Sequence, residues 1–297
     1  MLRQLMMLIL GTVLIFTACH TSDQTTDKAP STHAEDISEG KEKKDEDRSL
    51  NKDEEEKEES NHSLNDLEEI LLHMQEAAQS VKSVTITGIA EAKNTVAGTT
   101  SESTMEMKID ATLDPFIQHA VYTVTAGEGG KTEWYATDDE MFLFMEDSGW
   151  QKVVHPISVQ AASLIHRDNY FEHFILYKDL FELTEDNEHY MITYIGSDEQ
   201  YKEVFYGGII EQNFGEMVKE MTGIMADVEM GGAVEMKVSK DTFLIVEQHS
   251  IYKSSMEQSG MTLDTIQDGT YAYTYNEVSN VEIPEDVIKN AKELPNF

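Results

Sequence analysis

The distribution of apolar and polar residues divides the chain into three parts. Residues 5–16 form an apolar run that only Gly11 and Thr12 interrupt. The stretch 20–62 is polar throughout, and Ile37 and Leu50 are its sizeable apolar residues. Beyond it, apolar residues recur at regular spacing almost to the end of the chain. We therefore expect the folded part to begin near residue 63.

The first patterned segment has the spacing of an amphipathic helix. Apolar residues recur every three or four positions between 64 and 81, so that they share one face. Ser63 and Asp66 form a capping signature at its start. This pattern predicts a helix of four or five turns.

After Ser83 the apolar period changes to two, which is typical of strands. Val84 and Ile86 alternate with polar residues, and so do the apolar residues of 105–111. Further strand-like segments follow at 116–125, 133–136 and 141–145, with turn residues at 127–130, 137–140 and 147–149. Parallel strands need crossovers of roughly a dozen residues, so these short connections predict an antiparallel meander.

The second half of the patterned region mixes helices with strands. We expect helices at 156–165, 169–181 and 197–221, and a short terminal helix at 285–293 that follows Pro284. We expect strands at 189–195, 234–238, 242–252 and 261–275. Residues 63–297 therefore predict a single α+β domain built on a large antiparallel sheet.

The first nineteen residues are typical of a bacterial lipoprotein signal. Arg3 precedes the apolar run, which is too short to span a bilayer and resembles a secretory signal. Thr17 and Ala18 lead into Cys19 as in a lipobox, although Phe16 stands where leucine is usual. We expect residues 1–18 to be a signal peptide and Cys19, the only cysteine, to receive a diacylglyceryl group and acyl chains such as palmitate. The alternative is an ordinary signal peptide beside a chance cysteine.

Two or more acyl chains give stable membrane anchoring. The predicted location is therefore the extracellular face of the cell membrane, with the membrane as a partner through the lipid anchor. Residues 19–62 are expected to be the lipidated N-terminus followed by a disordered acidic linker. Between 20 and 62 there are 15 acidic and 7 basic residues and almost nothing to bury. The linker is interpreted as a spacer, with a partner-binding acidic tail as the alternative.

Charge and cysteine content exclude several classes of function. The formal net charge is −35, so the surface repels phosphate backbones and nucleic-acid binding is not expected. A single cysteine excludes an intramolecular disulfide and a cysteine-based zinc cluster.

Four stretches resemble an uncharacterised group of Gram-positive lipoproteins, and the order of elements resembles the LolA/LppX-type fold. The stretches are EWYATDDEMF at 133–142, GWQKV at 149–153, YNEV at 275–278 and IPEDV at 283–287. The resemblance implies a large curved antiparallel sheet, an open half-barrel, with helices packed on its concave face. It also implies an apolar cavity that shelters acyl chains, although fold alone does not fix function.

The residue content is compatible with such a cavity. The chain has 16 methionines, whose flexible thioethers suit a surface for variable hydrocarbon but also fill ordinary cores. The residues that we expect to line the cavity come from the alternating strands. They are Met105, Met107, Ile109, Trp134, Phe142, Phe144 and Met236.

No motif of enzymatic chemistry is recognised, so the protein is expected to be non-enzymatic, without a cofactor or a bound metal. His155, His166 and His173 are spaced by eleven and seven residues, unlike zinc ligands. The methionines 217, 221 and 225 would share one helical face, which suits copper(I) but is better explained by a buried stripe. There is no GxSxG, phosphate loop or GxGxxG motif.

Two functional hypotheses remain open. The first is a carrier of a lipid or other hydrophobic ligand, and the second is an interaction or scaffold lipoprotein of the cell envelope without a small ligand. The solute receptor of a transporter fits poorly, because such receptors alternate strands and helices. The sequence does not identify a protein partner.

Overall fold

The computed structural model describes residues 66–125, 130–154, 170–207, 228–258 and 261–293. The signal peptide (1–18), Cys19, the linker up to residue 62 and the predicted cap residue Ser63 lie outside the described residues. The same is true of the helix predicted at 156–165, of His155 and His166, and of the methionines 217, 221 and 225.

All strands that the structure describes form one twelve-stranded sheet. The first six strands are β1 (Ser83–Val96), β2 (Thr99–Leu113), β3 (Phe116–Val124), β4 (Gly130–Thr137), β5 (Glu140–Met145) and β6 (Gly149–Val154). The other six are β7 (Phe181–Glu185), β8 (His189–Tyr194), β9 (Glu229–Ser239), β10 (Ile245–Gln258), β11 (Met261–Tyr275) and β12 (Lys292–Glu293). The predicted large antiparallel sheet is confirmed.

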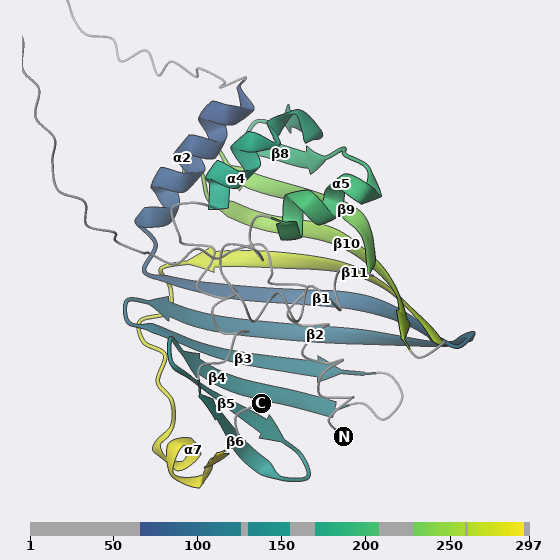
Figure 1. Cartoon of the computed structure of the whole chain (residues 1–297). Coiled ribbons are helices and arrows are strands. Elements are labelled where there is room, and N and C mark those ends of the chain that lie inside the picture. The colour runs from purple at the N-terminus through teal and green to yellow at the C-terminus, as the bar shows by residue number, and fades with distance from the viewer. Residues whose placement is uncertain (1–65, 126–129, 155–169, 208–227, 259–260, 294–297) are drawn as a thin grey trace, which may run out of the picture. The chain divides into compact units, whose positions relative to one another are not determined.

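The order of strands in the sheet is β12-β6-β5-β4-β3-β2-β1-β11-β10-β9-β8-β7. Two meanders, β1–β6 and β7–β11, therefore meet where β1 pairs with β11 (Figure 1). Every pair is antiparallel except β12 with β6, which is parallel. The sheet is curved and its ends do not pair with each other, so it remains open.

The helix α2 (Leu67–Gln79) precedes the sheet, and its N-cap is Asp66, three residues after the predicted cap residue Ser63. The side chain of Asp66 accepts a hydrogen bond from the backbone N–H of Glu68 at 2.9 Å, which satisfies one of the free amides of the first turn. The predicted apolar stripe is buried at Ile70, Leu71, Met74 and Ala78. The amphipathic helix predicted from the spacing is thus confirmed over these residues.

The helix predicted at 169–181 is shorter than expected. The observed α4 (Tyr170–Leu176) is followed by the 3-10 turn η2 (Lys178–Leu180), and Phe181 already belongs to β7. Phe181 pairs with Tyr194 of β8, so sheet pairing overrides the helical spacing of the large apolar residues. Both the length of the helix and the missing strand are corrections to the prediction.

The helix predicted from residue 197 begins as expected, but it does not continue as a regular α-helix. Ser197 and Gln200 form the capping box of α5 (Asp198–Lys202), in which each side chain accepts from the backbone of the other residue. The chain then continues as the π-helix η3 (Glu203–Gly207), and the rest of the predicted helix lies outside the described residues.

The terminal helix α7 (Glu285–Asn290) begins after Pro284, as predicted, but it ends three residues early. Lys292 and Glu293 form β12 and pair with β6 instead of extending the helix. Figure 1 shows α2, α4 and α5 in front of the sheet near β8–β10, whereas α7 lies near β5 and β6. Most of the described helices therefore pack at one face of the curved sheet.

Candidate functional site

The two faces of the sheet differ in chemistry, and we name them by the residues of β2. The inner face is the one that carries Met107 and Ile109, and the outer face carries the residues between them, such as Lys108. Successive side chains of a strand point to opposite faces, and the register extends each assignment to the neighbouring strands.

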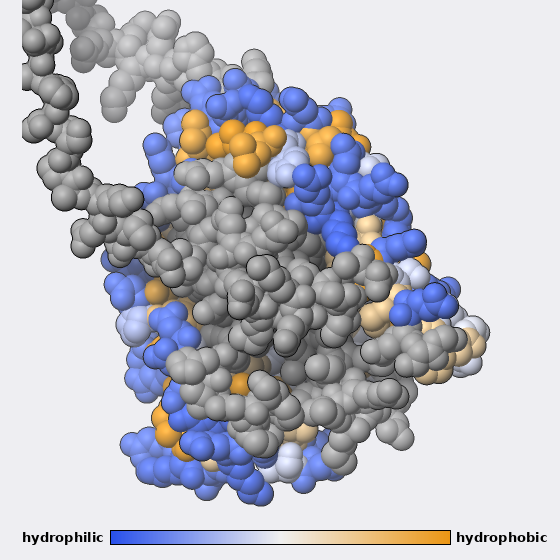
Figure 2. Space-filling view, in the orientation of Figure 1, coloured by the Kyte–Doolittle hydropathy of each residue, from blue (hydrophilic) through white to orange (hydrophobic). Residues whose placement is uncertain are grey.

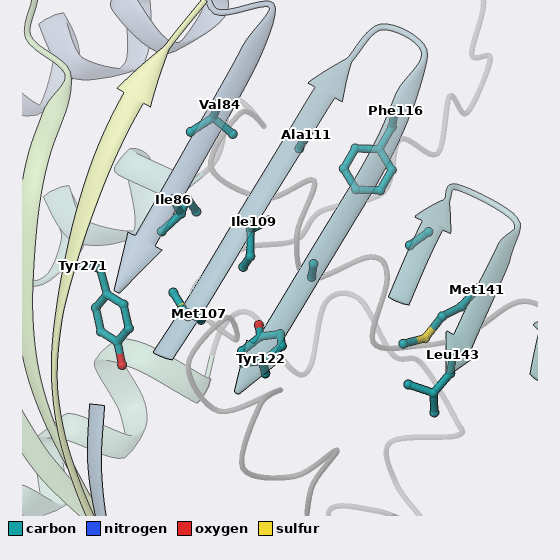
Figure 3. Packing of buried hydrophobic residues seen from close by; sticks show 12 residues of the cluster. Val84, Ile86, Met107, Ile109, Ala111, Phe116, Tyr122, Met141, Leu143 and Tyr271 are labelled. Carbon is teal, nitrogen blue, oxygen red and sulfur yellow. The ribbon is translucent and has the colours of Figure 1, made fainter. Parts of the chain in front are cut away.

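The inner face holds a continuous apolar cluster that extends over six strands, β1–β5 and β11 (Figure 3). Its twelve buried residues are Val84, Ile86, Met107, Ile109, Ala111, Phe116, Ala120, Tyr122, Ala136, Met141, Leu143 and Tyr271. Partly buried hydrophobic residues pack against it, namely Met105, Leu113, Trp134, Met145, Val153, Tyr273 and Tyr275. This cluster is the candidate functional site.

The structure brings five of the seven predicted cavity-lining residues to the inner face. Met105, Met107 and Ile109 alternate along β2, opposite Val124, Tyr122 and Ala120 of β3. Trp134 packs against the cluster, and Met236 is 1% exposed on the same face of β9. Their common face is established, and their role in ligand binding remains a prediction.

The other two predicted residues, Phe142 and Phe144, lie on the outer face. Both belong to β5, where they alternate with Met141 and Leu143 of the inner cluster. Phe142 is buried in a separate outer cluster with Tyr135 and Val287 of α7. The segment is apolar on both faces, so periodicity alone did not separate the two sets.

One row of the inner face crosses four strands and contains the two buried tyrosines of the cluster. The register places Tyr271 of β11 beside Gly88 of β1, then Met107 of β2, then Tyr122 of β3. A Cβ atom on Gly88 would lie 2.4 Å from Cδ1 of Tyr271. The glycine therefore leaves the space that the Tyr271 ring occupies.

Buried polar groups also occur on the inner face, and the motif search did not single them out. Gln118, Gln151 and Gln267 are 2%, 6% and 7% exposed. Gln267 donates from Nε2 to the hydroxyl of Tyr271 at 3.4 Å. The signal that marks them is the period of two: Gln118 shares its face with the apolar residues two positions away on each side.

The hydroxyl of Tyr122 is buried and has no hydrogen-bond partner among the described residues. The ring is 2% exposed and lies 4.9 Å from the ring of Trp134, centroid to centroid. Burial, and then the nearby Tyr271, raises the pKa of Tyr122 well above its ordinary value, so the group keeps its proton. It is thus a neutral donor in apolar surroundings.

A second group of aromatic residues fills the inner face where α4, α5 and η3 cover β7 and β8. Neighbouring rings meet edge to face: the Phe174–Phe181 and Tyr194–Phe205 centroids are 5.3 and 5.2 Å apart. Tyr201 of α5 lies 4.6 Å from Phe205. Close ring packing of this kind belongs to an ordinary core.

The outer face carries charged pairs rather than a reactive constellation. The carboxylate of Glu133 lies 3.0 Å from Nε2 of His119 and accepts from Nζ of Lys131 at 2.8 Å. Burial alone would raise the pKa of Glu133, but the hydrogen bonds and charges of Lys131 and His119 outweigh it and lower the pKa. The His119 ring also stacks on Tyr135 at 4.3 Å. These contacts stabilise the sheet surface.

Within the described ranges, no group of three or more His, Cys, Asp or Glu side chains is arranged to hold a metal ion. Within the same ranges, no helix has the length and apolarity needed to cross a membrane. What the inner face offers chemically is therefore apolar contact with a few buried hydrogen-bonding groups.

The structure is an open, curved antiparallel sheet with helices at its inner face, which is the architecture that the resemblance to the LolA/LppX-type fold predicted. The chain belongs to the family described as "Family of unknown function (DUF6612)", which matches residues 66–292. No curated protein matches the chain.

Solved structures of similar fold come from several bacteria. LprF from Mycobacterium bovis is 10% identical, with a TM-score of 0.37, over 73% of this chain and 95% of LprF. A DUF1329 family protein from Desulfovibrio piger is 9% identical, with a TM-score of 0.27, over 74% and 94%. The LolA superfamily protein NE2245 from Nitrosomonas europaea is 11% identical, with a TM-score of 0.26, over 74% and 95%.

Proposed function

We propose that the protein is a lipoprotein anchored at the extracellular face of the cell membrane, and that its folded part binds or carries a lipid or another hydrophobic ligand on the inner face of the sheet. The observation that supports ligand binding is the apolar cluster, which is continuous over six strands. The proposed role is non-enzymatic and needs no cofactor.

The composition of the cluster supports a ligand of variable shape. Four methionines, Met105, Met107, Met141 and Met145, contribute to it. Their unbranched thioether side chains adapt to irregular hydrocarbon more readily than branched residues do. Burying a methylene contributes about 0.8 kcal/mol, so ten methylenes would contribute on the order of 8 kcal/mol before entropy losses.

Ligand binding is tested by organic extraction of the purified protein. The full chain carrying Cys19→Ser removes the proposed covalent lipid, so any lipid in an organic extract is bound non-covalently. We expect mass spectrometry to find lipid in this extract and none in the extract of an unrelated protein purified in the same way. A lipid-free protein that also fails to take up added lipid would contradict ligand binding.

The anchor is supported by the N-terminal sequence, in which Cys19 follows a short apolar signal. We predict that cells fed an alkyne analogue of palmitate label the wild-type chain and leave Cys19→Ser unlabelled. Protease added to intact cells without an outer membrane should degrade the wild-type chain, because the folded part would lie outside. Equal labelling of both chains would show that Cys19 is not the modified residue.

The alternative role is that of an interaction or scaffold lipoprotein of the cell envelope. The observation in its favour is apolar surface: Leu176 at the end of α4 is 78% exposed and Leu72 of α2 is 46% exposed. Figure 2 shows hydrophobic residues gathered at the surface where α4 lies. Recovery of a defined envelope partner with a ligand-free protein would favour this role.

A further inference from the structure

The hydroxyl of Tyr122 is an unusual group for an apolar cluster. It comes from β3 in the row that also contains Met107 (Figure 3). The Tyr122 ring lies 4.9 Å from the ring of Trp134, centroid to centroid. The described residues provide no acceptor for it. Buried hydroxyl groups nearly always have a partner, because an unpaired buried donor costs free energy.

Three other tyrosines of the inner face have a hydrogen-bond partner for their hydroxyl groups. Tyr275 donates to the carbonyl oxygen of Ile245 at 2.8 Å, and Tyr273 donates to Oε1 of Gln248 at 3.1 Å. The hydroxyl of Tyr271 accepts from Gln267. Tyr122 differs from these three tyrosines because its hydroxyl has no hydrogen-bond partner, donor or acceptor, among the described residues.

We infer that the hydrophobic ligand carries a neutral hydrogen-bond acceptor, such as the carbonyl oxygen of an ester, that accepts a hydrogen bond from Tyr122 Oη. This inference rests on the proposed function and adds to it the chemical class of the ligand. The ligand is then a hydrocarbon chain with an ester group, as in an acylglycerol or a phospholipid, rather than a plain hydrocarbon.

The surroundings favour a neutral acceptor over a carboxylate. The twelve residues of the cluster are all uncharged, so none of them would balance a negative charge. Burying an unpaired carboxylate is far more costly than burying an ester, whose carbonyl needs one donor. Burial raises the pKa of Tyr122 well above its ordinary value, so the hydroxyl keeps the proton that it would donate.

The test compares two probes that differ in the acceptor. Methyl undecanoate has an ester carbonyl, and tridecane is a hydrocarbon of the same chain length. Each displaces the apolar fluorophore N-phenyl-1-naphthylamine from the full chain. We expect Tyr122→Phe to weaken binding of the ester about tenfold, which corresponds to about 1.4 kcal/mol, and to leave binding of tridecane unchanged.

A matched variant controls for general effects of losing a tyrosine hydroxyl. Tyr194→Phe removes the hydroxyl of a buried tyrosine outside the cluster, which already donates to the carbonyl oxygen of Ser197 at 2.8 Å. It should leave the preference for the ester as in the wild type. Thermal unfolding followed by circular dichroism should show Tyr122→Phe to be at least as stable as the wild type, because no internal hydrogen bond is lost.

The outcomes separate the inference from the proposed function. If Tyr122→Phe binds both probes as the wild type does, the inference is wrong while the proposed function stands. The same conclusion follows if Tyr194→Phe loses the preference to the same degree. If the wild type binds neither probe, the proposed function fails and the inference fails with it.

Discussion

Single residues determine how tightly the side chains of the inner face are packed. Gly88 of β1 lies opposite Tyr271 of β11, and the ring of Tyr271 occupies the space that a side chain at Gly88 would need. A Cβ there would also lie 3.0 Å from the backbone carbonyl oxygen of Thr270, which cannot move without disturbing β11. The row that ends at Tyr122 therefore begins with a tightly packed pair, Tyr271 and Gly88.

We predict that Gly88→Ala lowers the free energy of unfolding by roughly 1–3 kcal/mol, as overpacking of a core typically does. Urea unfolding followed by circular dichroism measures the change. Gly130→Ala is the matched control in a neighbouring part of the sheet, because no heavy atom lies within 4 Å of the new Cβ. Equal effects of the two substitutions would contradict the packing argument.

For single residues, the sequence predicted only part of the candidate site. The five predicted residues that lie on the inner face belong to strands whose alternation is visible from the sequence. Phe142 and Phe144 lie on the outer face. The sequence did not distinguish the two faces of β5, because both are apolar and α7 covers the outer one. The unpaired state of Tyr122 depends on what its hydroxyl meets across the fold, which no local pattern contains.

At the scale of elements, the hairpin of β1 and β2 shows how a turn determines register. Val96 pairs with Thr99, so the connection has two residues, Ala97 and Gly98. Their φ angles are +48° and +81°, the signs of a type I′ turn, whose twist matches that of the strands. Glycine adopts a positive φ readily, but alanine does so at a cost.

We predict that Ala97→Asn stabilises the protein by roughly 0.5–1 kcal/mol, because asparagine tolerates the left-handed conformation and Asn-Gly is favoured in this turn. A higher midpoint of thermal unfolding checks the gain. Gly98→Ala should act in the opposite direction, by about 1 kcal/mol, because it places a side chain at the second positive φ. A loss of stability in Ala97→Asn would contradict the turn argument.

Element boundaries were predictable where local signals and packing agree. The cap at Ser197 and the proline before α7 are read directly from the sequence and occur where expected. The prediction was wrong where they disagree: Phe181 continues a helical pattern, but it enters β7 because its backbone pairs with β8. Pairing with a distant strand is not encoded in the local spacing.

At the scale of the whole sheet, the pair β1–β11 joins the two meanders. It connects residues almost two hundred positions apart, and it extends from Val84 opposite Tyr275 to Val96 opposite Leu263. Without this pair, each meander would have an exposed central edge. The sheet should therefore unfold as one unit.

This cooperativity is testable with the two tryptophans of the chain. Trp134 lies in β4 and Trp150 in β6, so their fluorescence reports on the first meander, whereas far-ultraviolet circular dichroism reports on all strands. We predict coincident urea transitions by both methods. A tryptophan transition at a clearly lower or higher urea concentration would show that the meanders unfold separately.

Local patterns in the sequence were sufficient to predict the elements that depend on neighbouring residues. The alternation of apolar residues predicted the strands and the face to which most side chains belong, and capping residues predicted the helix starts, because both act within a few positions along the chain. The tertiary structure alone decided the joining of β1 to β11, the side of the sheet that α7 covers, and the isolation of the Tyr122 hydroxyl. These features arise from contacts between segments far apart in sequence, whose energies no local pattern records.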